Sequence, residues 1–161
     1  MKAVIVYYSL EGNTKYVVDT IANTINADVI ELKPKKVIPN SGFKKFLWGG
    51  KSVIFKEKPE LLNGKIDLST YDTVILGTPI WAGTFAPPLR TFLSECSIQG
   101  KQIFLFACHA GGGGDKCFEN IKTLIPGNTI KGVADFVNPL SAENQAKDKI
   151  QAFCNTIKTD L

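Results

Sequence analysis

The sequence predicts an α/β fold: one three-layer, doubly wound domain over residues 1–161, with a five-stranded parallel sheet in the order 2-1-3-4-5. Two observations predict it. Short apolar runs rich in β-branched and aromatic residues alternate with longer segments whose apolar residues recur at helical spacing. The length of 161 residues is that of a single domain and favours this strand order. Strands separated by helices form βαβ units, whose parallel sheet is covered on both faces.

The first two strands and the helix between them are expected before residue 33. Residues 2–8 (KAVIVYY) are almost continuously apolar, which is typical of a strand buried on both faces. In residues 13–25 the apolar side chains recur at helical spacing, as at residues 17, 18, 21, 22 and 25, which predicts a helix. Residues 27–32 form the second predicted strand.

Three further strands and three helices are expected from residue 73 onward. The strands are predicted at residues 73–78, 102–107 and 129–136, and the helices at residues 87–95, 116–124 and 141–157. Pro87 suits the first turn of its helix. Ser141, followed by Glu143, is typical of a capped start for the last helix.

A basic insert occupies about residues 33–68, between the second and third strands. From Lys33 to Asp67 there are nine lysines and three acidic residues, a net charge of +6, whereas the rest of the chain has a net charge of −2. We expect a short helix and a turn in residues 41–55, with the aromatic side chains packed on the core. The insert is either a solvated surface or a contact for an acidic partner or substrate. Because no nucleic-acid motif accompanies it, no nucleic-acid partner is expected.

The composition excludes several classes of protein. With 44% hydrophobic and 21% charged residues, the chain is globular rather than disordered. No apolar run approaches a membrane span and no signal peptide is recognisable, so a cytoplasmic location is expected. The four cysteines form no CxxC pair and His109 is the single histidine, which favours reduced thiols and argues against a metal site.

Three loops follow strands at the sheet edge where doubly wound folds bind ligands. The first combines a glycine with hydroxyl and amide side chains just before a helix, whose free N–H groups attract phosphate. Its residues are Ser9, Leu10, Glu11, Gly12, Asn13 and Thr14. The alternative is an ordinary turn in which Asn13 or Thr14 is the helix N-cap.

The second and third loops add an aromatic residue and a run of glycines. The second loop consists of Pro79, Ile80, Trp81, Ala82 and Gly83. Its indole either stacks on a flat ligand ring or covers a helix end. The third loop supplies Cys108, His109, Ala110, Gly111, Gly112 and Asp115. Its four successive glycines cost backbone entropy, which favours a backbone that cradles a ligand, while Cys108 is expected to be a small buried residue rather than a nucleophile.

The strand pattern and these three loops resemble the flavodoxin family over essentially the whole chain. The resemblance rests on Ser-x-Glu-Gly-Asn-Thr at residues 9–14, Thr-Pro-Ile-Trp-Ala-Gly at residues 78–83 and the glycine-rich third loop. It implies the flavodoxin-like fold and non-covalent binding of FMN by the residues named above. The phosphate is then expected at residues 9–14, and the isoalloxazine ring between residues 79–83 and 109–112.

The resemblance implies an electron-transfer protein that exchanges electrons with a redox partner protein or a small-molecule donor or acceptor, without a catalytic residue of its own. The alternative is an FMN-dependent NAD(P)H:quinone-type oxidoreductase, with the basic insert roofing a second pocket. A response-regulator receiver is excluded, since Gly77 and Thr78 stand where it needs an aspartate. A low-molecular-weight phosphatase needs Cys-x5-Arg, but Arg90 is the only arginine. Nor does the sequence contain a GxxxxGK[ST] or GxGxxG phosphate motif.

Overall fold

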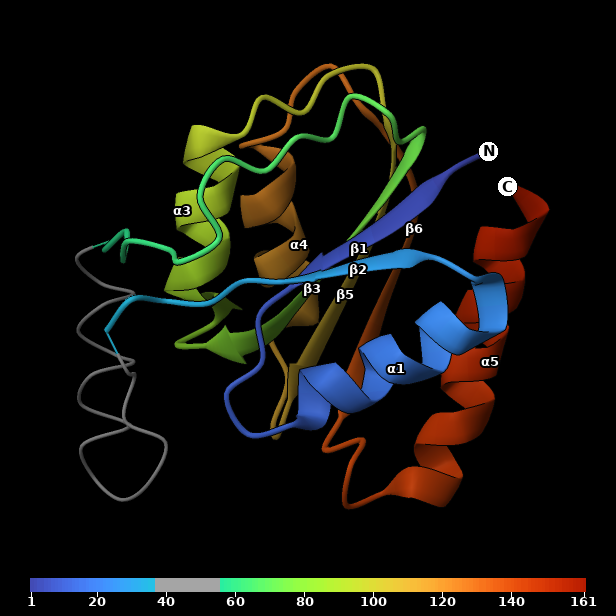
Figure 1. The fold of residues 1–161 in the computed structure, drawn as a ribbon. Helices are drawn as coiled ribbons and strands as arrows, with labels where there is room; N and C mark the ends of the chain where they lie inside the picture. The colour runs from blue at the N-terminus through green and yellow to red at the C-terminus, as the bar shows by residue number, and fades with distance from the viewer. Residues whose placement is uncertain (37–55) are drawn as a thin grey trace.

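A computed structural model describes residues 1–36 and 56–161. It places a parallel sheet between two layers of helices (Figure 1). The parallel strands are β1 (Ala3–Tyr7), β2 (Asp28–Glu31), β3 (Thr73–Trp81), β5 (Gln102–His109) and β6 (Thr129–Val137). Their order is β2-β1-β3-β5-β6, and a short β4 (Thr84–Phe85) pairs antiparallel with β3. Once β4 is set aside, the predicted order 2-1-3-4-5 is confirmed.

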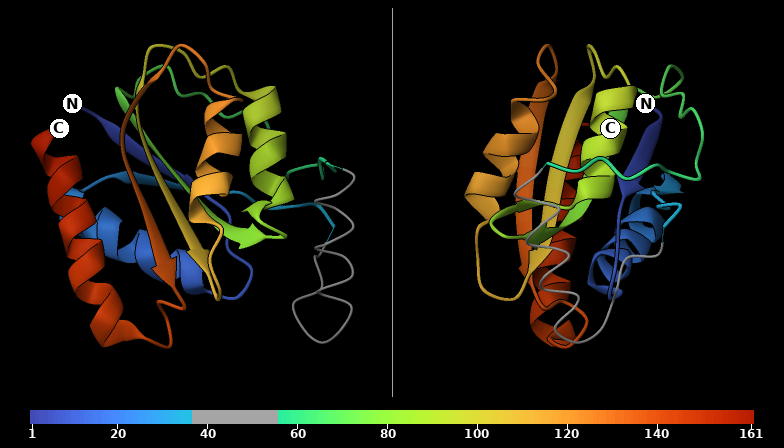
Figure 2. Two further views of the ribbon diagram at one scale, coloured as in Figure 1. Left: turned by 180° about the vertical axis from the view of Figure 1, so that it is seen from behind. Right: turned by 90° about the vertical axis from the view of Figure 1, so that its left-hand side faces the viewer.

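Two pairs of helices cover the two faces of the sheet (Figure 2). They are α1 (Asn13–Ile25) with α5 (Glu143–Thr159) on one face, and α3 (Pro87–Glu95) with α4 (Gly114–Lys122) on the other. The central strand β1 serves both cores, because successive side chains of a strand point to opposite faces. Val4 and Val6 pack toward α3 and α4, whereas Ile5 and Tyr7 pack toward α1 and α5.

The predicted helices agree with the structure to within two residues. Residues 13–25 and 87–95 coincide with α1 and α3, while α4 begins and ends two residues earlier than predicted and α5 two residues later. The predicted capping by Ser141 is wrong. Its hydroxyl donates to the carbonyl oxygen of Asn138 over 3.1 Å, and Ala142 occupies the N-cap of α5 without a side-chain cap. Ser141 therefore stabilises the preceding turn instead of the helix.

The described ends of the basic insert are joined to each other. Pro34 and Leu61 form an isolated antiparallel bridge. Asn63 accepts from the Lys33 N–H over 2.8 Å and donates to the Glu31 carbonyl over 2.7 Å. The predicted short helix and turn, with their aromatic side chains, fall within residues 37–55 and so lie outside the described residues.

Both ends of the chain lie together, away from the carboxyl ends of the strands (Figure 1). The amino group of Met1 donates to the carbonyl oxygen of Leu161 over 3.4 Å. Among the helices of residues 1–36 and 56–161, none is long and apolar enough to cross a membrane.

Candidate functional site

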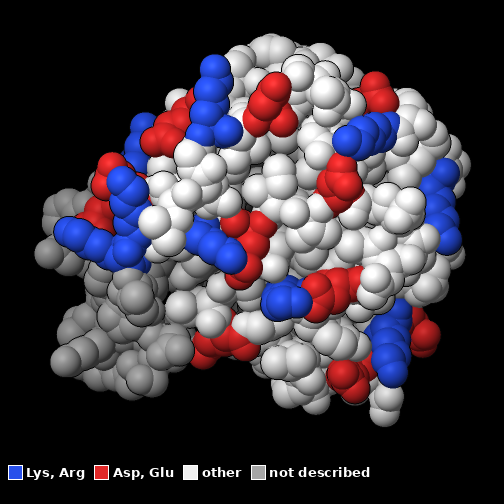
Figure 3. Space-filling view, viewed as in Figure 1, with Lys and Arg blue, Asp and Glu red and all other residues white. Residues whose placement is uncertain are grey.

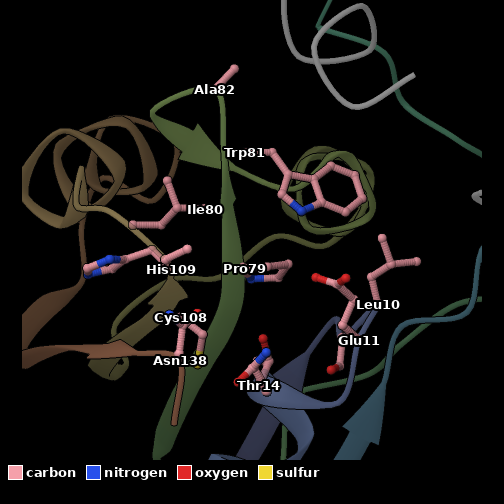
Figure 4. A pocket seen from close by; sticks show the side chains of 13 residues that line it. Leu10, Glu11, Thr14, Pro79, Ile80, Trp81, Ala82, Cys108, His109 and Asn138 are labelled. Atoms are coloured by element: carbon pink, nitrogen blue, oxygen red, sulfur yellow. The ribbon is translucent and has the colours of Figure 1, made fainter. Parts of the chain in front are cut away.

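The carboxyl ends of β1, β3, β5 and β6 converge on one cavity of about 410 Å³ (Figure 4). This volume is typical of small-molecule sites. The cavity is lined by Ser9, Leu10, Glu11, Asn13, Thr14, Pro79, Ile80, Trp81, Ala82, Cys108, His109, Ala110 and Asn138. Three segments far apart in the sequence, each singled out by its composition, therefore meet at one place.

The first loop turns from β1 into α1 through a glycine. Gly12 is the N-cap of α1 and has φ +92°, a left-handed conformation that favours glycine. Because Gly12 occupies the N-cap position, the interpretation of Asn13 or Thr14 as the N-cap is wrong. Asn13 instead accepts the N–H of Leu140 over 3.1 Å. The first N–H groups of a helix have no intrahelical acceptor, so this end of α1 presents donors beside the cavity.

The second loop is shorter than predicted, because β3 continues through Trp81. Thr78 accepts the N–H of Ala86 over 3.0 Å, and Trp81 pairs with Thr84 across a hairpin. The turn itself contains only Ala82 and Gly83, with φ +47° and +76°. Positive φ at both positions is the mark of a type I′ turn, whose twist matches that of a hairpin. An alanine in this conformation costs about 1–2 kcal/mol.

The indole of Trp81 is held at the side of the cavity by an aromatic neighbour. The rings of Tyr8 and Trp81 meet edge to face, with centroids 5.8 Å apart at 89°. Tyr8 itself is buried, and burial raises the pKa of its phenol above the ordinary value.

The third loop begins with a thiol and an imidazole that play different parts. Cys108 is 3% exposed, and burial raises its thiol pKa to about 12. It is a protonated packing residue, as predicted, since the thiolate is the reactive form. His109 accepts the N–H of Gly112 through Nδ1 over 2.7 Å, and its Nε2 lies 2.8 Å from a carboxylate oxygen of Asp135.

Asp135 links this histidine to the last helix. Its other carboxylate oxygen accepts from the ammonium group of Lys149 over 2.8 Å. Hydrogen bonds from Lys149 and His109 stabilise the carboxylate and lower its pKa to about 2. This network was not predicted from the sequence, because its members come from β5, β6 and α5.

The wall of the cavity contains no lysine or arginine among the described residues. The carboxylate-bearing Glu11 is exposed yet is one of the lining residues. An anion bound here would therefore be held by N–H groups and hydroxyls of the first loop, as the sequence predicts for a phosphate. No cluster of three or more metal-ligating side chains occurs in the described part of the chain.

Some predicted residues do not line the cavity: Gly12, Gly83, Gly111, Gly112 and Asp115. Gly12 and Gly83 lie in turns, and the residues adjacent to them in the chain line the cavity. Asp115 is exposed in the first turn of α4. Their contact with a cofactor stays a prediction. Asn138 lines the cavity but was missed; it has φ +40° in the Asn-Pro turn after β6, and that turn was the available signal.

The family model described as Flavodoxin matches residues 2–156. This chain belongs to the flavodoxin family. The match spans every element of the sheet and all of the loops at its carboxyl edge, so the resemblance inferred from the three loops is confirmed.

Solved structures share the fold of this chain. A flavoprotein from Lactobacillus acidophilus NCFM in complex with FMN superposes with a TM-score of 0.73 at 23% identity, covering 89% of this chain and 97% of that one. A candidate flavoprotein from Bacteroides eggerthii DSM 20697 has a TM-score of 0.74 at 22% identity and 98% coverage of both chains. Oxidised Flavodoxin 2 from Bacillus cereus has a TM-score of 0.62 at 16% identity, with both chains fully covered. At these identities the likeness establishes the fold.

Proposed function

We propose that this flavodoxin binds FMN non-covalently in the cavity at the carboxyl edge of the sheet and transfers electrons between redox partners. One observation carries the proposal: three loops of unusual composition converge on a single cavity that combines a helix N-terminus with an indole. The FMN-bound flavoprotein from Lactobacillus acidophilus supports the choice of ligand.

The donor set of the first loop suits a phosphate. Helix α1 contributes N–H groups and the positive end of its dipole. The Ser9 hydroxyl accepts the Lys15 N–H over 3.2 Å, which leaves its own proton for an anion. Thr14 is 1% exposed and adds a second hydroxyl to the cavity wall. These residues would bind the phosphate group of FMN without a salt bridge to any described residue.

The apolar part of the cavity suits an aromatic ring. Pro79, Ile80 and Ala110 contribute apolar surface, and Trp81 offers a large ring steadied by Tyr8. A stacked or edge-on indole contributes about 0.5–1.5 kcal/mol beyond its buried area. When bound, FMN supplies the redox chemistry, and the protein supplies binding, orientation and the polarity around the ring.

Charged side chains of opposite sign pair with one another on the described surface. On the face shown in Figure 3, basic and acidic side chains are interspersed. Lys2 pairs with Asp28 over 3.1 Å, and Lys35 with Glu60 over 3.1 Å. The reductase alternative places a second pocket under the basic insert, but residues 37–55 of that insert lie outside the described residues. Among the described residues, no observation favours this alternative.

The visible spectrum of the purified protein tests the proposal directly. We expect a yellow protein whose heat-released cofactor runs as FMN on chromatography, and an apoprotein that FMN saturates. A colourless protein that FMN does not saturate refutes the binding. Negligible NADH or NADPH oxidation with a quinone acceptor, together with stepwise anaerobic reduction, supports a carrier; steady turnover supports the reductase.

A further inference from the structure

We infer that His109 is a positioning residue, which fixes residues 110–113 of the third loop, here called the glycine loop, through its Nδ1 atom. It offers a bound ligand neither a proton donor nor an acceptor. The inference deepens the proposed function and rests on it only where FMN is concerned. A histidine beside a flavin site is otherwise naturally interpreted as a hydrogen-bond partner or proton source for the ligand.

Both ring nitrogens of His109 are engaged by the protein. The Gly112 N–H is a donor, so the Nδ1 atom that it reaches at 2.7 Å carries no proton. The proton of the neutral ring is therefore on Nε2, which donates to Asp135 over 2.8 Å. Only 6% of the side chain is exposed, and Figure 4 shows the imidazole directed away from Trp81 and Thr14.

Three elements hold this ring in place. Strands β5 and β6 pair Ala107 with Asp135. His109 is two residues further along β5 and so points to the same face of the sheet as the Asp135 carboxylate. Lys149 on α5 binds the far oxygen of that carboxylate over 2.8 Å. The backbone of His109 is itself fixed, since its carbonyl accepts the Asn138 N–H over 2.9 Å. These contacts hold the imidazole in a fixed position relative to the sheet.

The glycine loop needs such a contact to adopt one conformation. Gly112 and Gly113 have φ +116° and +96°, and added Cβ atoms at Gly111 and Gly112 would find nothing within 4 Å. Side-chain packing therefore specifies little of this segment. Ordering each residue costs about 1–2 kcal/mol, and more for glycine. The bond from Gly112 to Nδ1 ties the middle of the loop to β5, and Ala110, within that closed turn, lines the cavity.

Two amide substitutions separate the two ring nitrogens. The side-chain oxygen of asparagine takes the place of Nδ1, so His109→Asn retains an acceptor for the Gly112 N–H. The amide nitrogen of glutamine takes the place of Nε2, so His109→Gln retains the donor to Asp135 and loses that acceptor. Thr14→Ala is the control, because it alters another side chain of the cavity wall and removes neither hydrogen bond of the His109 ring.

The first measurement is hydrogen exchange of the Gly112 amide by NMR in the flavin-free protein, with circular dichroism to verify folding. We expect exchange to accelerate about tenfold in His109→Gln, and to stay within about threefold of the parent in His109→Asn and Thr14→Ala. Equal exchange in the two His109 variants overturns the inference. If His109→Gln does not fold, Asp135→Ala, which frees the ring, must accelerate exchange; unchanged exchange there also overturns it.

The second measurement is the affinity for FMN at neutral pH. The dissociation constant should rise about tenfold in His109→Gln and by less than threefold in His109→Asn. Equal losses in both variants, with unaltered Gly112 exchange, would mean that His109 contacts the ligand directly, and the inference fails. If the parent protein does not bind FMN, the proposed function fails, while amide exchange still decides the role of His109.

Discussion

A methyl group added at Gly77 would collide with the ring of Phe106. The Cβ atom of Gly77→Ala would lie 2.2 Å from Cζ and 2.6 Å from Cε1 of that ring, where ordinary contacts begin at 3.4 Å. The ring must therefore move by about 1.2 Å. It has little room to do so, because Phe106 is fully buried and packs edge to face on Phe136 and Phe153, at 6.2 Å and 6.4 Å.

The cost follows from the density of the core. Overpacking of this kind costs about 1–3 kcal/mol, and the two aromatic neighbours put Gly77→Ala near the upper end. Alanine loses less conformational entropy than glycine when the strand forms, which stabilises the variant by about 0.5–1 kcal/mol. We expect a net loss of about 2 kcal/mol from the free energy of unfolding, a substantial share of the 5–15 kcal/mol typical of a domain.

A double-mutant cycle tests this account by urea unfolding of the flavin-free protein. Phe106→Leu alone should cost about 1–2 kcal/mol through the space it leaves. In the double variant the new methyl group occupies part of that space, so the losses should fall short of their sum by at least 1 kcal/mol. Additive losses would refute the collision. Gly111→Ala is the matched control, since its added methyl meets nothing within 4 Å; it should change stability by less than about 0.5 kcal/mol.

Three further predictions concern the cavity and its surroundings. Trp81→Phe should weaken FMN binding and abolish most of the flavin-dependent quenching of tryptophan fluorescence. Thr14→Ala should cost about 1–3 kcal/mol of FMN affinity and almost none of riboflavin affinity, because only FMN has the phosphate. Asp135 has a pKa of about 2 in the folded protein against 3.8 ordinarily, so its stabilising contribution is complete above about pH 4 and is lost as pH falls through 2. Asp135→Asn should cost about 1 kcal/mol at pH 6, after discounting for a side chain 38% exposed, and nothing below pH 2.

Each of these predictions has a contradicting outcome. Unaltered quenching in Trp81→Phe would assign the signal to the other tryptophan, Trp48. Equal losses of FMN and riboflavin affinity in Thr14→Ala would show that the hydroxyl supports the fold rather than the phosphate. For Asp135→Asn, a stability difference from the parent that persists at about pH 1, well below the pKa of the folded protein, would mean that the carboxylate charge is not its source.

Local pattern was sufficient for most of the fold. The apolar spacing of residues 13–25 and the prolines that begin α3 predicted both helices to the residue. The end of β3 was predicted too early, because Pro79 pairs with Cys108 of β5 and the next two residues pair with the two-residue β4. No periodicity encodes these contacts.

The sequence predicted those parts of the candidate site whose functional residues lie next to one another in a single loop. The glycine and hydroxyls of residues 9–14, and Trp81, stand out in the sequence by type. The link from His109 to Asp135 does not, since 26 residues separate them and only the register of β5 with β6 brings them together. Asn138 enters the cavity for the same reason.

Because residues 1 and 161 lie side by side, this 161-residue chain is a candidate for circular permutation. The terminal amino group and the last carbonyl are 3.4 Å apart, so a linker of a few residues could join them without reaching across the molecule. The junction would lie away from the cavity, which leaves the three loops intact (Figure 1). New ends opened in the turn at Gly127, between α4 and β6, would move the edge strand and α5 to the front of the chain. Such a permutant would show whether the order in which the strands are synthesised matters to assembly of the pocket.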